Sequence, residues 1–119
     1  MSATYKQDGE VLTFVAPSGG VVNGTPILIQ NVVVVPTATA DSGVEFEGRI
    51  EGVFRGVLKA SGATWTTGQV LYFDTADATF KTAQSSTARR AAIAAAPAGS
   101  SDTTGDVKLD NIGAAVNVA

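Results

Sequence analysis

The order of hydrophobic and polar positions along the chain is that of a protein built from short β-strands. Short apolar runs alternate with clusters of Gly, Pro, Asn, Asp and Ser, at the close spacing typical of a sandwich or barrel. We expect strands at residues 10–16, 27–30, 32–35, 44–51, 53–58, 69–74, 80–82 and 106–109. The predicted fold class is therefore all-β, a small single-domain β-barrel or β-sandwich with short strands and little or no helix.

Residues 44–51 show the clearest alternation of apolar and charged side chains. One face of this expected strand carries Val44, Phe46, Gly48 and Ile50, and the other carries Glu45, Glu47, Arg49 and Glu51. Because side chains alternate across a strand, we expect the first set in the core and the second at solvent or at a partner. The runs at 27–30 and 32–35 are apolar throughout, which predicts strands buried on both faces.

Residues 87–96 are ambiguous between a strand and a helix. The run from residue 88 to residue 96 is dominated by Ala and contains Arg89 and Arg90. Ala has the highest intrinsic helix propensity, so the local sequence alone predicts a helix. Pro97 and Gly99 end the segment in either case.

Turn signals separate the expected strands. Asn23-Gly24 is suited to a tight turn with positive φ. Residues 75–78 connect the strands at 69–74 and 80–82, which we expect to pair, and Asp74 and Asp77 flank this turn. A Ca²⁺ site needs more oxygen ligands at regular loop spacing, so we interpret the two carboxylates as turn residues.

Size and composition point to one domain with a covered surface. The chain has 119 residues and a mass of 12.0 kDa. We expect a β domain at 1–109, with an N-terminal arm at 1–8, and a C-terminal tail at 110–119. Charged residues make up 16% of the chain, against about 25% in a typical soluble domain. So little charge suits a protein whose surface is partly covered by a partner.

The charge balance and hydropathy disfavour two kinds of partner. The net charge is -3 and the pI about 4.7, whereas a nucleic-acid binder needs a basic surface. No apolar run approaches the roughly 20 residues that span a bilayer, so no membrane partner is expected. The first residues contain no hydrophobic signal segment, so we expect synthesis in a cytoplasm.

The sequence lacks the side chains that most enzymatic chemistry requires. There is no His and no Cys, so Ser-His-Asp and Cys-His arrangements are impossible. Glu45 and Glu47 lie about 7 Å apart on one strand face, but like charges on an exposed strand are common and weakly coupled. With Arg49 beside them, we interpret the pair as a solvated or partner-binding face. We expect no enzyme, no catalytic residue, no cofactor and no metal.

Six residues are candidates for a protein interface. They are Glu45, Glu47, Arg49, Arg89, Arg90 and Tyr5. The arginines at 89 and 90 are equally consistent with an acidic partner surface and with solvation. Neighbours on a strand point to opposite faces, so at most one of them faces a given surface. No basic groove accompanies the aromatic residues, so we expect core and interface anchors and not a base-stacking platform. Trp65 is expected to be at least partly buried.

Three stretches carry a resemblance to a known family. The first is QDGEVLTFVAP at 7–17, followed by GGVV at 19–22 and NG at 23–24; the second is EGVF at 51–54 with LKASG at 58–62; the third is ATWTTGQVLYFD at 63–74. In order and spacing they resemble the capsid cement family, the trimeric head decoration proteins of tailed bacteriophages. The resemblance covers approximately residues 4–109.

The resemblance implies a structural protein without catalytic residues. A homotrimer would bind the outer surface of the phage head, at local three-fold positions between capsomers, and bridge neighbouring subunits of the major capsid protein. The protein would be made in the host cytoplasm and located on the virion. The resemblance also implies a strand at 90–95, since tertiary context can override helix propensity.

Two alternatives belong to other classes of function. One is a non-catalytic β-barrel adaptor, or a carbohydrate-binding module, of a phage tail or baseplate. A sugar-binding module would expose Trp or Tyr as a platform. The other is an enzyme that uses carboxylates, which would need a raised carboxylate pKa inside a cleft.

Overall fold

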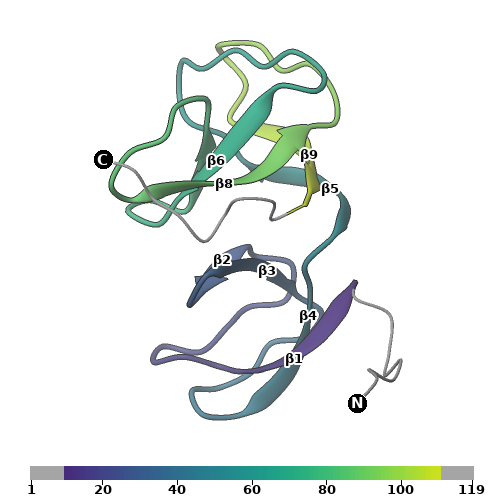
Figure 1. Ribbon diagram of the computed structural model, residues 1–119, viewed down its shortest axis with the longest axis vertical. Coiled ribbons are helices and arrows are strands. Elements are labelled where there is room, and N and C mark those ends of the chain that lie inside the picture. Colours follow the sequence, from purple (N-terminus) through teal and green to yellow (C-terminus); the bar gives the residue numbers. More distant parts are fainter. Residues whose placement is uncertain (1–9, 111–119) are drawn as a thin grey trace, which may run out of the picture.

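The computed structural model of the protein describes residues 10–110, which form nine β-strands and no helix (Figure 1). The strands of the first sheet are β1 (Val11–Val15), β2 (Ile27–Ile29), β3 (Val32–Pro36) and β4 (Glu45–Arg49). Those of the second sheet are β5 (Gly52–Leu58), β6 (Val70–Asp74), β7 (Thr79–Lys81), β8 (Ala88–Ala94) and β9 (Thr104–Leu109). The sheet orders are β1-β4-β3-β2 and β5-β9-β8-β6-β7, with antiparallel pairing throughout.

The two predicted terminal segments fall mostly outside this range. The arm predicted at 1–8 lies outside the described residues, and so does the predicted tail apart from Asp110. Between residues 10 and 110 the structure contains no helix long and apolar enough to cross a membrane.

β3 joins the two sheets through its side chains. Val34 lies in the hydrophobic cluster inside the first sheet, while Val33 and Val35 belong to the cluster inside the second sheet. Alternate side chains of a strand point to opposite faces, so this strand supplies both cores. Two-sided burial is confirmed for these three valines, which are at most 6% exposed. It is wrong for β2, which is only half-buried, because β2 is an edge strand of its sheet.

The second sheet curls around the larger cluster. Trp65 is 1% exposed and lies against Gly105, where a Cβ atom would clash with the indole ring. The edge strands approach each other at an isolated parallel bridge between Lys59 and Phe80, and the Ala60 N–H donates to the Phe80 carbonyl at 3.1 Å. This contact does not close a barrel. The two sheets stack as a sandwich (Figure 1), which confirms the all-β fold class.

The alternation predicted at 44–51 is confirmed within β4. Its two inward residues are buried, and its three charged residues are exposed. The expectation that Val44 lies in the core is wrong, because this residue is 51% exposed. Val44 precedes the strand and closes a turn, in which its N–H donates to the Asp41 carbonyl at 3.0 Å.

Residues 88–94 form the strand β8, which resolves the ambiguity at 87–96. The strand that the resemblance implies at 90–95 is confirmed, and the helix favoured by the local sequence alone is not formed. β8 lies between β9 and β6, in the interior of the second sheet. Its pairing with β6 passes from Leu71 opposite Ala92 to Tyr72 opposite Arg90. Ala91 is therefore the extra residue of a β-bulge. The bulge explains why Ala91 and Ala92 are both fully buried, and only small side chains fit two such neighbours.

Both predicted turns are present. Gly24 has a φ of 80°, and the Thr25 N–H donates to the Val22 carbonyl at 3.1 Å. β6 and β7 form the expected hairpin, in which Phe73 lies opposite Phe80. The two rings pack with centroids 5.2 Å apart.

Gly48 of β4 lies directly against the side chain of Val34 on β3. A Cβ atom on Gly48 would collide with the Cγ1 of Val34, and it would lie 3.4 Å from the Phe46 ring and 3.5 Å from the Phe14 ring. The first core therefore needs glycine at this position for lack of space, and not for its backbone freedom.

Replacing Gly48 with Ala is expected to lower the free energy of unfolding by about 1–3 kcal/mol, because the added methyl group overpacks the core. Gly99→Ala is the control, since a Cβ atom there meets only the Asp102 carboxylate, at 3.6 Å. Its effect should stay within about 0.5 kcal/mol. Urea unfolding followed by Trp65 fluorescence measures both variants. Equal stability of the two would show that the first core has room for a methyl group.

Candidate protein interface

β1 and β4 present a side-chain face that the second sheet leaves open. β4 contributes the exposed residues Glu45, Glu47 and Arg49. Opposite them on β1 lie Val15, Thr13 and Val11, in that order. Thr13 and Val15 are also exposed. Three of the predicted interface residues thus lie side by side, in a strip of both charge signs next to a hydroxyl and an apolar side chain. We call these five exposed residues the β1–β4 face.

The pairing register explains why this face is open. Val35 lies opposite Arg49, so the two side chains are on the same side of the first sheet. Val35 packs into the cluster of the second sheet, whereas Arg49 is exposed. The second sheet therefore covers the β3 part of this side and stops before β4.

Large apolar side chains are exposed on several described strands and turns. They are Val15, Val22, Val44, Val53, Leu58 and Val70, which are 36% to 64% exposed. Val15 and Val44 lie at the end of the β1–β4 pair, where the Ala16 N–H donates to the Val44 carbonyl at 2.9 Å. Val53 and Leu58 belong to β5, an edge strand. An edge strand with apolar side chains favours association with another chain.

The two candidate arginines make contacts within the chain. Arg89 donates from Nη1 to the Asn31 Oδ1 at 3.0 Å, which links β8 to the turn between β2 and β3. Arg90 forms a two-pronged pair with Asp110, with N···O distances of 2.9 and 3.2 Å. Both arginines are half-buried. Tyr5, the remaining candidate, lies outside the described residues.

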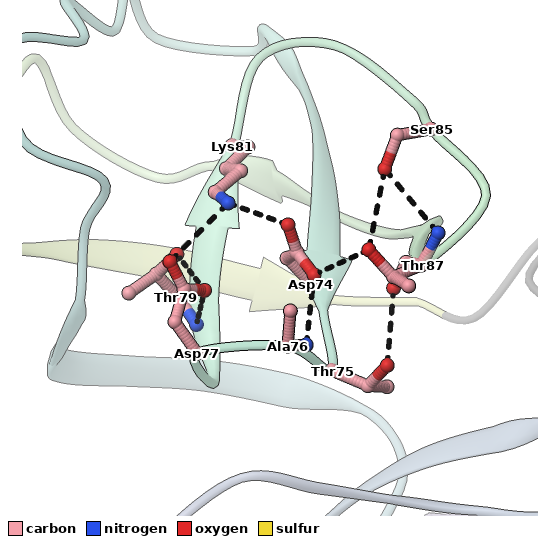
Figure 2. Close-up of polar contacts among 8 residues, drawn as sticks. All are labelled: Asp74, Thr75, Ala76, Asp77, Thr79, Lys81, Ser85 and Thr87. Carbon is pink, nitrogen blue, oxygen red and sulfur yellow. Dashed lines mark hydrogen bonds and ion pairs between the residues drawn. The ribbon is translucent and has the colours of Figure 1, made fainter.

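A network of polar contacts fixes the hairpin between β6 and β7 (Figure 2). The buried Asp74 carboxylate accepts hydrogen bonds from the Ala76 N–H and the Thr87 hydroxyl, each at 2.8 Å. Lys81 Nζ donates to the other oxygen of the same carboxylate. The hydrogen bond from Lys81 is the main reason why the pKa of Asp74 lies below its ordinary value.

Asp77 lies on the exposed side of the same hairpin. It accepts hydrogen bonds from the Thr79 hydroxyl at 2.7 Å and the Thr79 N–H at 3.3 Å, and it lies 3.2 Å from Lys81 Nζ. The Thr79 hydroxyl is the main cause that lowers the pKa of Asp77, and the bond to Asp74 is the main cause that raises the pKa of Lys81. The interpretation of both carboxylates as turn residues is confirmed.

Asp74→Asn is expected to lower the free energy of unfolding near pH 7 by about 1–3 kcal/mol, because the buried Asp74 side chain loses its charge-assisted hydrogen bonds with Lys81 and Thr87. The folded-state pKa of Asp74 lies below 3.8. Its stabilisation is therefore complete above the unfolded-state pKa and is lost as the pH falls through the folded-state value. The stability difference between wild type and variant should shrink in acid.

Urea unfolding near pH 7 and near pH 3 measures this difference. Asp41→Asn is the control, since Asp41 is exposed and the substitution removes the same charge. Its effect should stay within about 0.5 kcal/mol at either pH. A difference for Asp74→Asn that is the same at both pH values would contradict the assigned role of the carboxylate.

The exposed valines are the part of this surface that sequence reasoning missed. Val15 lies directly opposite Glu45, and a strand position paired with an exposed glutamate is itself expected to face outward. That signal exists only once the pairing of β1 with β4 is known. The sequence alone gives neither the partner nor the register.

Comparison with known protein families gives a match over most of the chain. A family model described as phage cement protein matches residues 6–109. No curated protein matches the chain, and no solved structure matches it either. The matched range contains both sheets, the β1–β4 face and the Asp74 hairpin.

Proposed function

The chain belongs to the phage cement protein family, a structural and non-catalytic family, and from this premise we propose that it binds the outer surface of a phage head as a homotrimer. Each trimer lies between capsomers and stabilises the contacts of neighbouring major capsid protein subunits. The family match over nearly the whole domain is the observation that carries this proposal.

Two surface features support association with other protein chains. Only 16% of the residues are charged, and six large apolar side chains among the described residues are exposed by a third or more. Single exposed apolar residues are ordinary. Two of them on one edge strand, as in β5, give a surface that a second chain can cover.

The apolar β5 edge and the charged β1–β4 face suit different contacts, one between copies of the chain and one with the capsid. Interfaces between identical subunits are more apolar than other interfaces, so we assign the contact between copies to the β5 edge with Val53 and Leu58. The β1–β4 face carries charges of both signs, which suits a contact that selects its partner by electrostatic complementarity. We assign this face to the major capsid protein. Arg89, Arg90 and Tyr5 remain candidates for the rim of either contact.

Trimerisation strengthens attachment without strong individual contacts. After one subunit binds, the other two face their sites at a high effective concentration, so the affinities combine. A modest strip such as the β1–β4 face is then sufficient for firm attachment. A cement protein of this kind raises the force needed to separate capsomers, because the contacts on both sides must break together.

Residues 10–110 do not provide the aromatic platform that the sugar-binding alternative needs. It requires an exposed indole or phenol ring, but Trp65 is 1% exposed and lies in the core of the second sheet. Tyr72 is half-buried on β6. The aromatic rings of residues 10–110 therefore favour the cement function.

The homotrimer is tested by size-exclusion chromatography with light scattering, and the capsid contact by co-sedimentation with undecorated, expanded heads of the parent phage. We expect a trimeric mass, either free in solution or in the copy number bound per head, and saturable binding. A protein that stays monomeric on the head contradicts the trimer. A trimer that never binds the head contradicts the cement function.

Glu45→Lys/Glu47→Lys is expected to weaken head binding at least ten-fold, the equivalent of about 1.4 kcal/mol, and to leave the thermal unfolding midpoint unchanged because both side chains are exposed. Glu10→Lys/Asp41→Lys is the matched control, since it reverses two exposed charges that are not among the five residues of the β1–β4 face. Co-sedimentation measures both variants. Equal weakening by both would assign the effect to net charge, and not to this face.

A further inference from the structure

The hydrogen bonds between β1 and β4 leave half of the β1 backbone facing an open edge. β1 is an edge strand of the first sheet, with β4 beside it (Figure 1). The Ile50 N–H donates to the Glu10 carbonyl and the Ala16 N–H donates to the Val44 carbonyl, each at 2.9 Å. Bonded and non-bonded residue pairs alternate along an antiparallel ladder. The even-numbered residues of β1 therefore bond to β4, and the N–H and C=O groups of the odd-numbered ones point to the open edge.

The contact between β4 and β3 supports this assignment. Glu47 lies opposite Thr13, and the Glu47 carbonyl accepts a hydrogen bond from the Thr37 N–H at 3.0 Å, on the β3 side. The backbone groups of this pair thus point away from each other, and those of Thr13 and Val15 point outward. Among residues 10–110, β4 is the only strand that pairs with β1.

β1 lacks the features that keep an edge strand from pairing with another chain. Such edges are usually very short, bulged, or interrupted by Lys or Pro. The edge strands β2 and β7 have three residues each, and β5 changes register between Phe54 and Val57. β1 has five residues in unbroken register with β4, and its sequence VLTFV contains no charge and no Pro. Of the four edges of the described sheets, β1 is the one best suited to accept a further strand.

An uncharged cleft of about 440 Å³ lies beside this edge. It is lined by Phe14, Val15, Ile29, Gln30, Asn31 and Val32. Phe14, Ile29 and Val32 pack on the first core but remain half-buried. A strand added to β1 would point every second side chain to the same face as Phe14, and apolar side chains at those positions would cover the exposed part of the core.

The other face of the same edge is acidic. Thr13 lies opposite Glu47 and Val15 lies opposite Glu45, and all four side chains are exposed. Neighbouring strands are separated by about 4.8 Å, so a strand added to β1 would lie about 10 Å from β4. Its side chains opposite Thr13 and Val15 would point to the same face as the two glutamates. Lys or Arg at those positions can reach across β1 to the carboxylates.

We propose that an extended segment of the major capsid protein pairs with the outer edge of β1 as a fifth strand of the first sheet. The segment alternates apolar residues, which cover the cleft, with Lys or Arg residues, which face Glu45 and Glu47. Main-chain hydrogen bonds to Thr13 and Val15 supply affinity, and the side chains supply selectivity. This inference rests on the proposed capsid binding. The two odd-numbered residues also belong to the β1–β4 face assigned to the capsid, so the occupant is capsid protein and not a second copy.

The first test removes one backbone donor from the edge. Thr13→Pro deletes the outward N–H and keeps the bonds to β4, because Pro is tolerated on an edge strand where the N–H faces solvent. Thr13→Ala is the control, since it shortens the same side chain and keeps the N–H. In co-sedimentation with undecorated, expanded heads of the parent phage, Thr13→Pro should bind about ten-fold more weakly than wild type, and Thr13→Ala within about two-fold of it.

Equal binding by Thr13→Pro and Thr13→Ala would overturn the strand pairing, whether both bind like wild type or both are weakened. Either result leaves the cement function standing, because the wild type still binds. Wild-type protein that never binds the head contradicts the proposed function itself, and the strand pairing with it.

Hydrogen exchange of the wild-type protein tests the same contact without a variant that has to fold. In the free protein the Leu12 and Phe14 amides are protected by β4, and those of Thr13 and Val15 exchange fast. After exchange on the head, release and NMR, we expect the Thr13 and Val15 amides to be slowed about ten-fold, with Leu12 and Phe14 unchanged. Unchanged exchange at all four amides would overturn the pairing. Slow exchange of Thr13 and Val15 before head binding would also overturn it, and would assign the edge to another copy of the chain.

Discussion

The two-sided burial of β3 is the constraint on which the rest of the structure depends. Val34 packs inside the first sheet, and its neighbours Val33 and Val35 pack into the second. Neither core is complete without this strand, so the two sheets share one apolar element and stack as a sandwich. The same register places Arg49 beyond the edge of the second sheet. The position of the exposed charged strip is thus a consequence of where β3 is covered.

Much of the fold could be predicted from local patterns, because those patterns report burial directly. The alternation in β4 and the continuous valine run in β3 both specify which faces meet the core. The Asp residues around the β6–β7 turn were also predictable, since short carboxylates satisfy turn N–H groups. These features depend on neighbours in sequence.

Local sequence patterns misled where contacts between residues distant in sequence determine the structure. The Ala-rich β8 has a helical preference, but its place between β9 and β6 requires small side chains at a bulge, and tertiary packing overrides so small a preference. Val44 fits the alternation of β4, yet it belongs to the turn that precedes this strand, which begins only at Glu45. The exposed apolar residues of the candidate interface could not be predicted, because their exposure depends on how far the second sheet extends over the first.

The Arg90–Asp110 pair has a consequence for the end of β9. Asp110 closes the last strand with a backbone bond and a two-pronged ionic contact at side chains that are 26% and 15% exposed. Asp110 is therefore held in a fixed position beside β8. A peptide fused directly after Asp110 for display would therefore be attached at a fixed point at the end of β9.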